Sequence, residues 1–300
     1  MLPYEFVDLK NGESISEELS ASTLLGIDTE FMREKTYFAE LCLVQLSIGP
    51  RIFCVDPLGA TELGTFWSAL TDCEWVLHSG RQDMEVIYQA SGRMPSRVFD
   101  TQVAAALLGF APQLGYAGLV TELFQVDLDK SHTRADWSRR PLSDEVLRYA
   151  AEDVKFLLPA YDELRQRLDK LGRYHWAVQD SLDLLDRSLY EVDPTHAVER
   201  VKGARNMKGV AYAVAVRLAE WREREALKRN RPRQWILRDA VLLEIAQTRP
   251  ASRSALLKIN ELAERTVSRA GEQILEAIAA AQNDSLDYVP PASEQASSSS

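Results

Sequence analysis

Two acidic residues near the N-terminus, Asp28 and Glu30, have the chemical type and the spacing of metal ligands. They lie on either side of Thr29 at the end of the apolar run Leu24–Ile27, which is expected to form a strand. Side chains at positions i and i+2 of a strand point to the same face, so both carboxylates can be aimed at one point. A solvated acidic turn produces the same pattern, and the motif alone does not distinguish the two.

Two further carboxylates are expected on the buried faces of helices. Asp83 falls on a helical stripe with Ile87 and Ala90, and Asp153 lies one turn after Tyr149 on another apolar stripe. A charged group on an apolar stripe is costly unless it is paired or binds a metal. The alternatives are a first-turn aspartate stabilised by the helix dipole and a core aspartate bonded to the Tyr149 hydroxyl.

The four carboxylates need a common explanation. Like charges repel at short range, and bound cations allow them to remain ionised together. Oxygen ligands suit Mg²⁺ or Mn²⁺, and two such ions about 4 Å apart can activate a water and stabilise the leaving oxygen in phosphodiester hydrolysis. The sequence therefore predicts a two-metal hydrolytic centre in which Tyr149 orients the attacking water. The chain has no zinc-ligand spacing, no Ser-His-Asp or Cys-His pattern and no P-loop motif, so no nucleotide cofactor is expected.

The elements that would position these residues alternate along the first half of the chain. Apolar runs predict strands at residues 24–28, 41–48, 51–55, 75–78 and 97–99, and helical patterns lie near 61–70, 81–91, 100–109, 116–124 and 143–171. Gly49-Pro50 predicts a hairpin turn. This order indicates an α/β fold, a mixed sheet with an early antiparallel meander and helices on both faces. From about residue 207 the spacing is helical throughout, which predicts a second, all-α domain.

The charge of the 300 residues is unevenly distributed. The net charge is −10, but residues 1–200 hold 19 Lys and Arg against 33 Asp and Glu, whereas residues 201–300 hold 16 against 12. An acidic domain repels phosphate unless its carboxylates bind cations, and a basic domain can capture the polyanion. We expect a catalytic domain at 1–172, a helical connector at 173–202, a helical nucleic-acid-binding domain at 203–283 and a disordered tail at 284–300.

Composition excludes several other classes of protein. With 46% hydrophobic and 27% charged residues, the chain is an ordinary globular one. No apolar run approaches the roughly 18 residues that span a membrane, and the N-terminus has no leader pattern, so no membrane partner is expected. The three cysteines lack CxxC spacing, which favours free thiols and a cytoplasmic location.

Three motifs occur in the order DTE, HSGRQD and YAAED, within longer stretches such as IDTEFMREKTYFAELCLVQLS and LDKSHTRADWSRRPLS. Over residues 20–170 the chain resembles the ribonuclease D family, in the DEDDy branch of 3′→5′ exonucleases with a ribonuclease H-like fold. The resemblance implies that Asp28, Glu30, Asp83 and Asp153 hold two divalent ions and that Tyr149 positions the water. It also implies release of 5′-mononucleotides from RNA with a free 3′ end, with tRNA precursors as the substrate.

Two other functions remain open at this point. A DEDDy exonuclease that acts on DNA has the same metal site, because that site does not recognise the 2′-hydroxyl. A non-catalytic adaptor that uses both domains only to bind nucleic acid is the second alternative.

The segment at about 203–283 resembles the HRDC domain. Residues 201–283 hold 16 Lys and Arg against 9 Asp and Glu, with a dense basic run between Arg222 and Arg238. Cations beside Trp221 and Trp235 suit phosphate contact and base stacking, and two core tryptophans under a solvated helix face are the alternative. We favour nucleic-acid binding for the basic run and core packing for the two tryptophans. The candidate RNA-binding residues of the whole chain are Tyr37, Gln45, Lys130, Arg134, Trp137, Arg229, Arg231 and Arg233.

Overall fold

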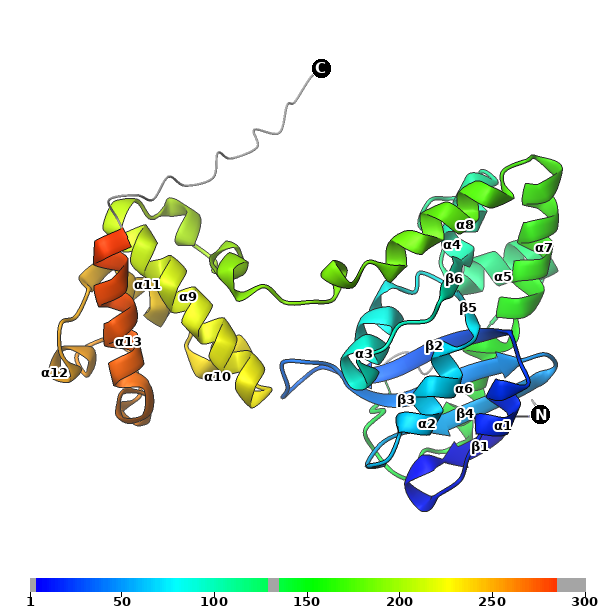
Figure 1. Cartoon of the computed structure of the whole chain (residues 1–300), viewed down its shortest axis with the longest axis horizontal. Helices are drawn as coiled ribbons and strands as arrows, with labels where there is room; N and C mark the ends of the chain where they lie inside the picture. Colours follow the sequence, from blue (N-terminus) through cyan, green and yellow to red (C-terminus); the bar gives the residue numbers. More distant parts are fainter. Residues whose placement is uncertain (1–3, 129–134, 285–300) are drawn as a thin grey trace. The chain divides into compact units, whose positions relative to one another are not determined.

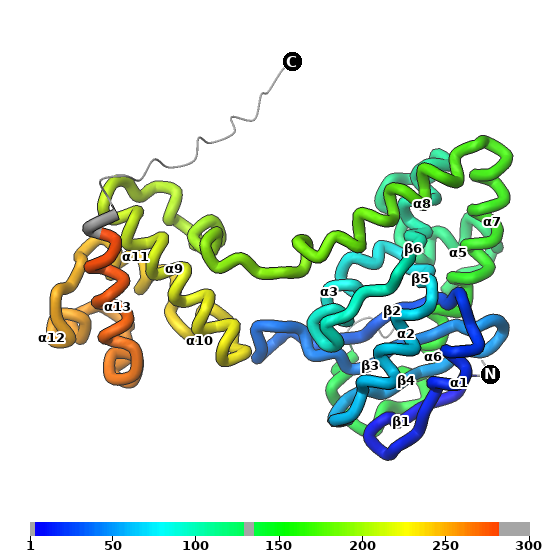
Figure 2. The backbone as a smooth tube through the Cα atoms, in the orientation of Figure 1, coloured from blue at the N-terminus to red at the C-terminus, as the bar shows by residue number. Residues whose placement is uncertain are grey.

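The computed structural model describes residues 4–128 and 135–284 (Figures 1 and 2). It divides into two compact units: the first extends to Glu191 except for Lys35–Tyr37, and these three residues form the second unit with the chain from Val192 onward. The candidates Lys130 and Arg134, and residues 285–300 of the tail expected at 284–300, lie outside the described residues.

A six-stranded mixed sheet forms the centre of the first unit. Its strands are β1 (Glu5–Asp8), β2 (Leu24–Met32), β3 (Glu40–Ile48), β4 (Arg51–Asp56), β5 (Glu74–Leu77) and β6 (Arg97–Asp100), in the spatial order β1-β4-β3-β2-β5-β6. The pairs β2–β3 and β3–β4 are antiparallel, and the remaining pairs are parallel. The antiparallel meander around Gly49-Pro50 and the mixed sheet were both predicted from the sequence and are confirmed.

Helices cover both faces of this sheet. The first face packs against α1 (Ser16–Ser20), α2 (Gly64–Thr71) and α3 (Arg81–Ser91), and the second against α4 (Thr101–Leu107), α5 (Tyr116–Phe124), α6 (Asp144–Lys155), α7 (Leu157–Lys170) and α8 (Tyr174–Leu182). Neighbouring residues of β3 enter different cores, since Val44 packs with the first set of helices and Leu43 with the second. A strand covered on both faces has a continuous apolar sequence, which explains the weak alternation of this one.

The structure corrects two boundaries and adds two short elements. Asp28 and Glu30 do not end their strand, because β2 continues to Met32 with a register shift between Glu30 and Phe31. The helix expected over 143–171 is interrupted at Phe156, where α6 ends and α7 begins. The short elements β1 and α1 were not predicted; each has too few residues for a periodic signal.

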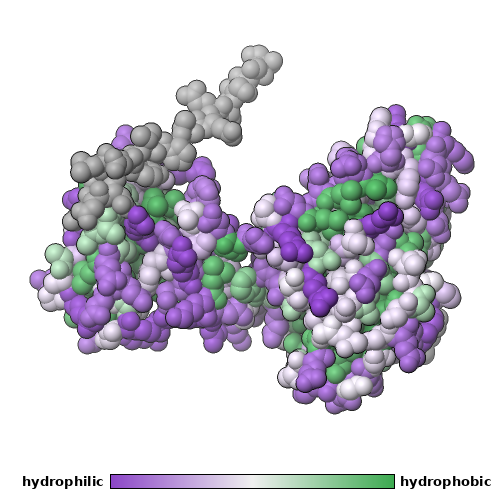
Figure 3. All heavy atoms as spheres, in the orientation of Figure 1, coloured by the Kyte–Doolittle hydropathy of each residue, from purple (hydrophilic) through white to green (hydrophobic). Residues whose placement is uncertain are grey.

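The second unit is helical. Short 3-10 turns at Pro194–Arg200 and Ala204–Asn206 precede α9 (Gly209–Arg229), α10 (Arg233–Ile236), α11 (Asp239–Thr248), α12 (Arg253–Leu256) and α13 (Glu264–Asp284). Their apolar sides form a separate core that includes Leu218, Leu242 and Ile274. The face of the molecule in Figure 3 is largely hydrophilic over these helices, as expected when amphipathic helices turn their apolar sides inward. Among the described residues, no helix has the length and apolar character needed to cross a membrane.

Candidate active site

Asp28 and Glu30 project from the same face of β2, the face that packs against α6 and α7. Their register partners on β3 are Gln45 and Leu43, which point to that face as well. Both acidic side chains are only partly buried, so they remain accessible to a ligand. The sequence predicted this common face correctly, although the strand continues beyond the motif.

Asp83 lies in the first turn of α3 and is tied directly to β2. Its Oδ1 atom accepts a hydrogen bond from the Thr29 backbone N–H at 3.0 Å and another from the Thr29 hydroxyl at 2.6 Å. Asp83 is buried, at 7% exposure, and α3 packs against the opposite face of the sheet from α6. The two bonds therefore hold this carboxylate beside the strand that bears Asp28 and Glu30.

The turn before α3 is organised by Asp100, the last residue of β6. Its carboxylate accepts hydrogen bonds from the backbone N–H groups of Ser79 and Gly80 at 3.0 Å, and it also caps α4 through the N–H of Gln102. Ser79 has a positive φ of 57°, a conformation that is uncommon for a residue other than glycine. Asp100 therefore fixes the backbone from which Asp83 projects.

Tyr149 and Asp153 project from one side of α6. The helix begins with a Ser143 cap and has two acidic residues in its first turn, so it is well defined from the residue after the cap onward. A hydrogen bond joins the Tyr149 hydroxyl to the Asp153 carboxylate. The Trp137 ring lies 6.3 Å from the Tyr149 ring, centroid to centroid, which restricts the position of the phenol.

The pKa values of the four carboxylates connect them in one electrostatic cluster. Burial raises the pKa of Glu30 to about 8, with the charges of Asp153 and Asp83 adding to the effect. Burial likewise raises the pKa of Asp28 well above its usual range, and Asp83, Asp153 and Glu30 raise it further.

The other two carboxylates are shifted less. Burial raises the pKa of Asp153 to about 7, and the hydrogen bond from Tyr149 opposes the rise. Burial raises the pKa of Asp83 to about 6 against the hydrogen bonds from Thr29. All four groups therefore resist ionisation in the absence of a compensating positive charge.

This donor set fits divalent cations. Every candidate ligand is a carboxylate oxygen, the ligand that hard cations such as Mg²⁺ prefer, and a cation would offset the repulsion that raises these pKa values. Within residues 4–128 and 135–284, however, no group of three His, Cys, Asp or Glu side chains is gathered closely enough to hold a metal ion. The effect of their charges on the pKa values of Asp28 and Glu30 places the four carboxylates near one another, although they do not surround a single point as closely as metal ligands do.

Two of the predicted RNA-binding residues, Gln45 and Trp137, are buried, and a third, Tyr37, belongs to the second unit. Gln45 is fully buried beside Asp28, and neither Oε1 nor Nε2 of its amide has a hydrogen-bond partner among the described residues. Trp137 is buried at 2% exposure. Tyr37 belongs to the second unit, where its hydroxyl donates to Glu223 and its backbone N–H donates to Asn230 at 3.0 Å.

The arginines of the predicted basic run already have partners. Arg229 pairs with Glu225, Arg233 lies 3.7 Å from the Glu223 carboxylate, and Arg231 donates to the Lys35 carbonyl. The two tryptophans beside the run differ in environment. Trp221 is partly buried and bonds Gln273, whereas Trp235 is 59% exposed, so the interpretation of Trp235 as a core residue was wrong.

Sequence reasoning missed the ion pair that fixes the segment before α6. Arg140 donates to both carboxylate oxygens of Asp56 at 2.5 and 2.7 Å, and also to the carbonyls of Cys42 and Trp137. Asp56 lies 84 positions earlier in the sequence, at the end of β4, so no local pattern reveals the pair. This contact fixes Trp137, and through it the surroundings of Tyr149.

Comparisons with known proteins agree with the sequence motifs. A 3′-5′ exonuclease family model matches residues 5–169, more than half of the chain, and an HRDC domain model matches residues 212–278. Ribonuclease D of Gluconacetobacter diazotrophicus is 42% identical over 275 residues, which are 89% of this chain and 69% of the relative.

Solved structures show the same similarity. Escherichia coli RNase D is 30% identical, with a TM-score of 0.82, and the match covers 96% of this chain and 77% of that one. Brucella melitensis NrnC with bound Mg²⁺ is 27% identical, with a TM-score of 0.50, and the match covers 64% of this chain and 96% of that one. An exonuclease fold of this type uses divalent metal ions, consistent with the donor set on β2, α3 and α6. The chain belongs to the ribonuclease D family and is a 3′–5′ exoribonuclease with an HRDC domain.

Proposed function

We propose that this exoribonuclease trims the 3′ extensions of tRNA precursors and releases 5′-mononucleotides one at a time. The observation that supports the chemistry is that the charges of Asp83 and Asp153 raise the pKa values of both Asp28 and Glu30, while Asp153 is hydrogen-bonded by Tyr149. The substrate class is supported by Escherichia coli RNase D, which is described as an exoribonuclease involved in structured RNA processing.

The catalytic roles are divided among five residues. Asp28, Glu30, Asp83 and Asp153 would hold two divalent ions, with Mg²⁺ or Mn²⁺ as the candidates. When bound, such a pair supplies an activated water and stabilises the leaving oxygen. Tyr149 holds the attacking water through its hydroxyl, which the bond to Asp153 keeps in place.

The RNA-binding candidates act in different ways under this proposal. Gln45 and Trp137 are buried, so they would position catalytic groups rather than contact the strand at the surface. Contact with phosphate would require four of the candidates to give up the hydrogen bonds or ion pairs that they make in the structure: Tyr37, Arg229, Arg231 and Arg233. Lys130 and Arg134 are retained as candidates from the sequence alone. A cytoplasmic location also remains our proposal, and three free, buried cysteines are compatible with it.

A 5′-labelled tRNA precursor with a short 3′ trailer tests the function. With Mg²⁺ or Mn²⁺ we expect a ladder that shortens from the 3′ end and pauses where the acceptor stem begins. EDTA and Asp28→Ala should each abolish the ladder, while Asp162→Ala, which changes an exposed aspartate of α7, should not. Equal trimming of an unstructured RNA with the same trailer would contradict the tRNA assignment, and equal trimming of the matching DNA would contradict RNA selectivity.

A further inference from the structure

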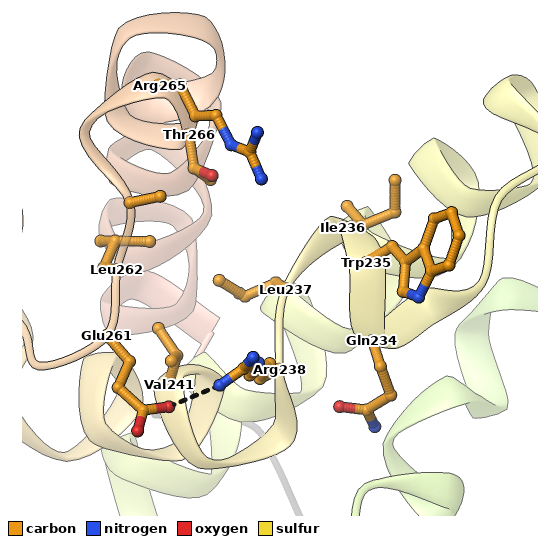
Figure 4. A pocket seen from close by; sticks show the side chains of 11 residues that line it. Gln234, Trp235, Ile236, Leu237, Arg238, Val241, Glu261, Leu262, Arg265 and Thr266 are labelled. Atoms are coloured by element: carbon orange, nitrogen blue, oxygen red, sulfur yellow. Dashed lines mark hydrogen bonds and ion pairs between the residues drawn. The ribbon is translucent and has the colours of Figure 1, made fainter.

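The second unit contains a pocket at the C-terminal end of the basic run that the sequence singled out. It has a volume of about 480 Å³ and lies between the α10 turn and the start of α13 (Figure 4). Leu237, Val241 and Leu262 supply apolar surface, and Trp235, Arg238 and Arg265 supply an aromatic ring and two cations. This volume is within the range of small-molecule sites, about 300–1,000 Å³.

The aromatic ring at this pocket is largely exposed to water. Trp235 is 59% exposed, the highest value among the large apolar side chains of the described chain. Exposure of the apolar indole surface to water is unfavourable, and a planar ring that stacks on the indole removes part of that surface from solvent. The Arg231 guanidinium lies 5.9 Å from the Trp235 ring centroid, so positive charge is already present beside the ring.

The cations at the pocket are available to an anion. Arg265 is exposed and makes no hydrogen bond or ion pair with any residue that the structure describes. In Figure 4 it extends from α13 toward the side of the pocket that bears Leu237. Arg238 pairs with Glu261 at 2.9 Å, but both side chains are more than half exposed. A pair in that setting contributes at most about 1 kcal/mol, so a phosphate can displace it.

We propose that this pocket binds one unpaired nucleotide of the RNA strand. The base stacks on Trp235 above the apolar surface, and the phosphate is bound by Arg265 and Arg238. Charge complementarity favours this occupant over an acidic or neutral peptide that needs a longer groove, because residues 201–283 hold 16 Lys and Arg against 9 Asp and Glu. Unlike Arg229 and Arg233, Arg265 has no acidic partner among the residues that the structure describes. The inference rests on the proposed RNA substrate but concerns residues outside the catalytic site.

Strand binding by the full chain tests the pocket without catalysis. Fluorescence anisotropy would follow a 5′-labelled oligouridylate of about twelve nucleotides in EDTA. Trp235→Ala and Arg265→Glu should each weaken binding by about ten-fold, because stacking and phosphate contact are lost. Trp235→Phe should retain most of the affinity. Arg265→Ala should also reduce the slope of log affinity against log salt by about 0.7, the value for one phosphate contact on a single strand.

Two matched variants control for surface effects. Trp176→Ala removes another exposed tryptophan, at 48% exposure on α8, and Arg269→Glu reverses an exposed charge one turn further along α13, outside the pocket. Both should bind the strand like the unmodified chain. Thermal unfolding verifies that the pocket variants fold, which is expected because Trp235 and Arg265 are exposed.

The outcomes separate the pocket from the proposed function. Two results would overturn the pocket assignment even if the 3′ ladder forms. One is unchanged strand affinity in Trp235→Ala and Arg265→Glu. The other is a loss of affinity in Trp176→Ala and Arg269→Glu as large as that in the pocket variants. Weaker binding confined to the pocket variants supports the assignment. If the chain then releases no nucleotide with Mg²⁺ or Mn²⁺, the proposed function fails while the pocket remains.

Discussion

Thr29 donates two hydrogen bonds to Asp83, one from its backbone N–H and one from its hydroxyl, across 54 positions of sequence. Thr29 points to the opposite face of β2 from Asp28 and Glu30. The threonine between the two acidic residues therefore attaches the third carboxylate to the strand, so one tripeptide fixes three of the four candidate ligands.

Loss of the Thr29 hydroxyl should impair catalysis more than folding. Thr29→Val keeps the β-branched shape and the backbone hydrogen bond but removes the hydroxyl bond at 2.6 Å. The hydroxyl bond lowers the pKa of Asp83, so its loss should raise that pKa. Removal of a group that orients a metal ligand typically reduces activity about 10-fold to 100-fold. The acidic limb of the pH–rate profile should also move to higher pH. Thr29→Ser, which keeps the hydroxyl, is the control, and equal rates for the two variants would contradict this role.

The metal-free protein should lose stability as the pH rises. The folded-state pKa values of about 8 for Glu30, about 7 for Asp153 and about 6 for Asp83 exceed the usual values of about 4. For each carboxyl, the folded state binds more protons than the unfolded state at any pH between its usual pKa and its raised folded-state pKa. The free energy of unfolding then falls by about 1.4 kcal/mol per pH unit for each carboxyl within its interval. Thermal unfolding in EDTA from about pH 5 to about pH 8 measures this slope.

Divalent ions should reverse that slope. Mg²⁺ or Mn²⁺ should raise the melting temperature more at the alkaline end of the interval, where the carboxylates are ionised. Glu30→Gln should flatten the slope in EDTA, since it removes the carboxyl with the highest of the three values. A metal-free protein whose stability rises over the same interval would show that these carboxyls are not buried together as described.

Tyr149 should affect turnover and not strand binding. Tyr149→Phe keeps the ring beside Trp137 but removes the hydroxyl that bonds Asp153. A group that orients the attacking water contributes a factor of about 100, so kcat should fall by that amount while KM stays the same. Single-turnover rates on labelled RNA measure this. A purely structural tyrosine would instead lower the melting temperature and leave kcat unchanged.

Gln45 should matter for activity although it contributes nothing to stability. Its buried amide lies beside Asp28 and has no hydrogen-bond partner within the described part of the chain, and such a group costs about 1–3 kcal/mol. Gln45→Met fills the same space, so the metal-free variant should be at least as stable as the unmodified chain. Its exonuclease rate should nevertheless decrease, because the amide next to Asp28 is lost. Full activity in this variant would remove Gln45 from the site.

Local patterns in the sequence predicted the sheet, its flanking helices and the shared face of Asp28 and Glu30. They failed where a contact joins distant positions, as in Thr29 with Asp83 or Asp56 with Arg140. Spacing cannot reveal such pairs, because the fold alone brings them together.

The extension of β2 was missed for a related reason. The acidic motif interrupts the apolar run, so the run appeared to end there. Phe31 and Met32 continue the strand beyond the motif by pairing with β3. The exposure of Trp235 was missed because an aromatic residue at helical spacing is usually part of a core.

Asp28, Glu30, Asp83 and Asp153 are proposed to form one metal centre. Direct titration of the chain with Mn²⁺ tests it without any RNA. We predict two ions per chain for the unmodified protein and for Asp162→Asn, and loss of at least one ion in each of Asp28→Asn and Asp153→Asn. Full Mn²⁺ binding in both of these variants would contradict the assignment of the four carboxylates to the metal site.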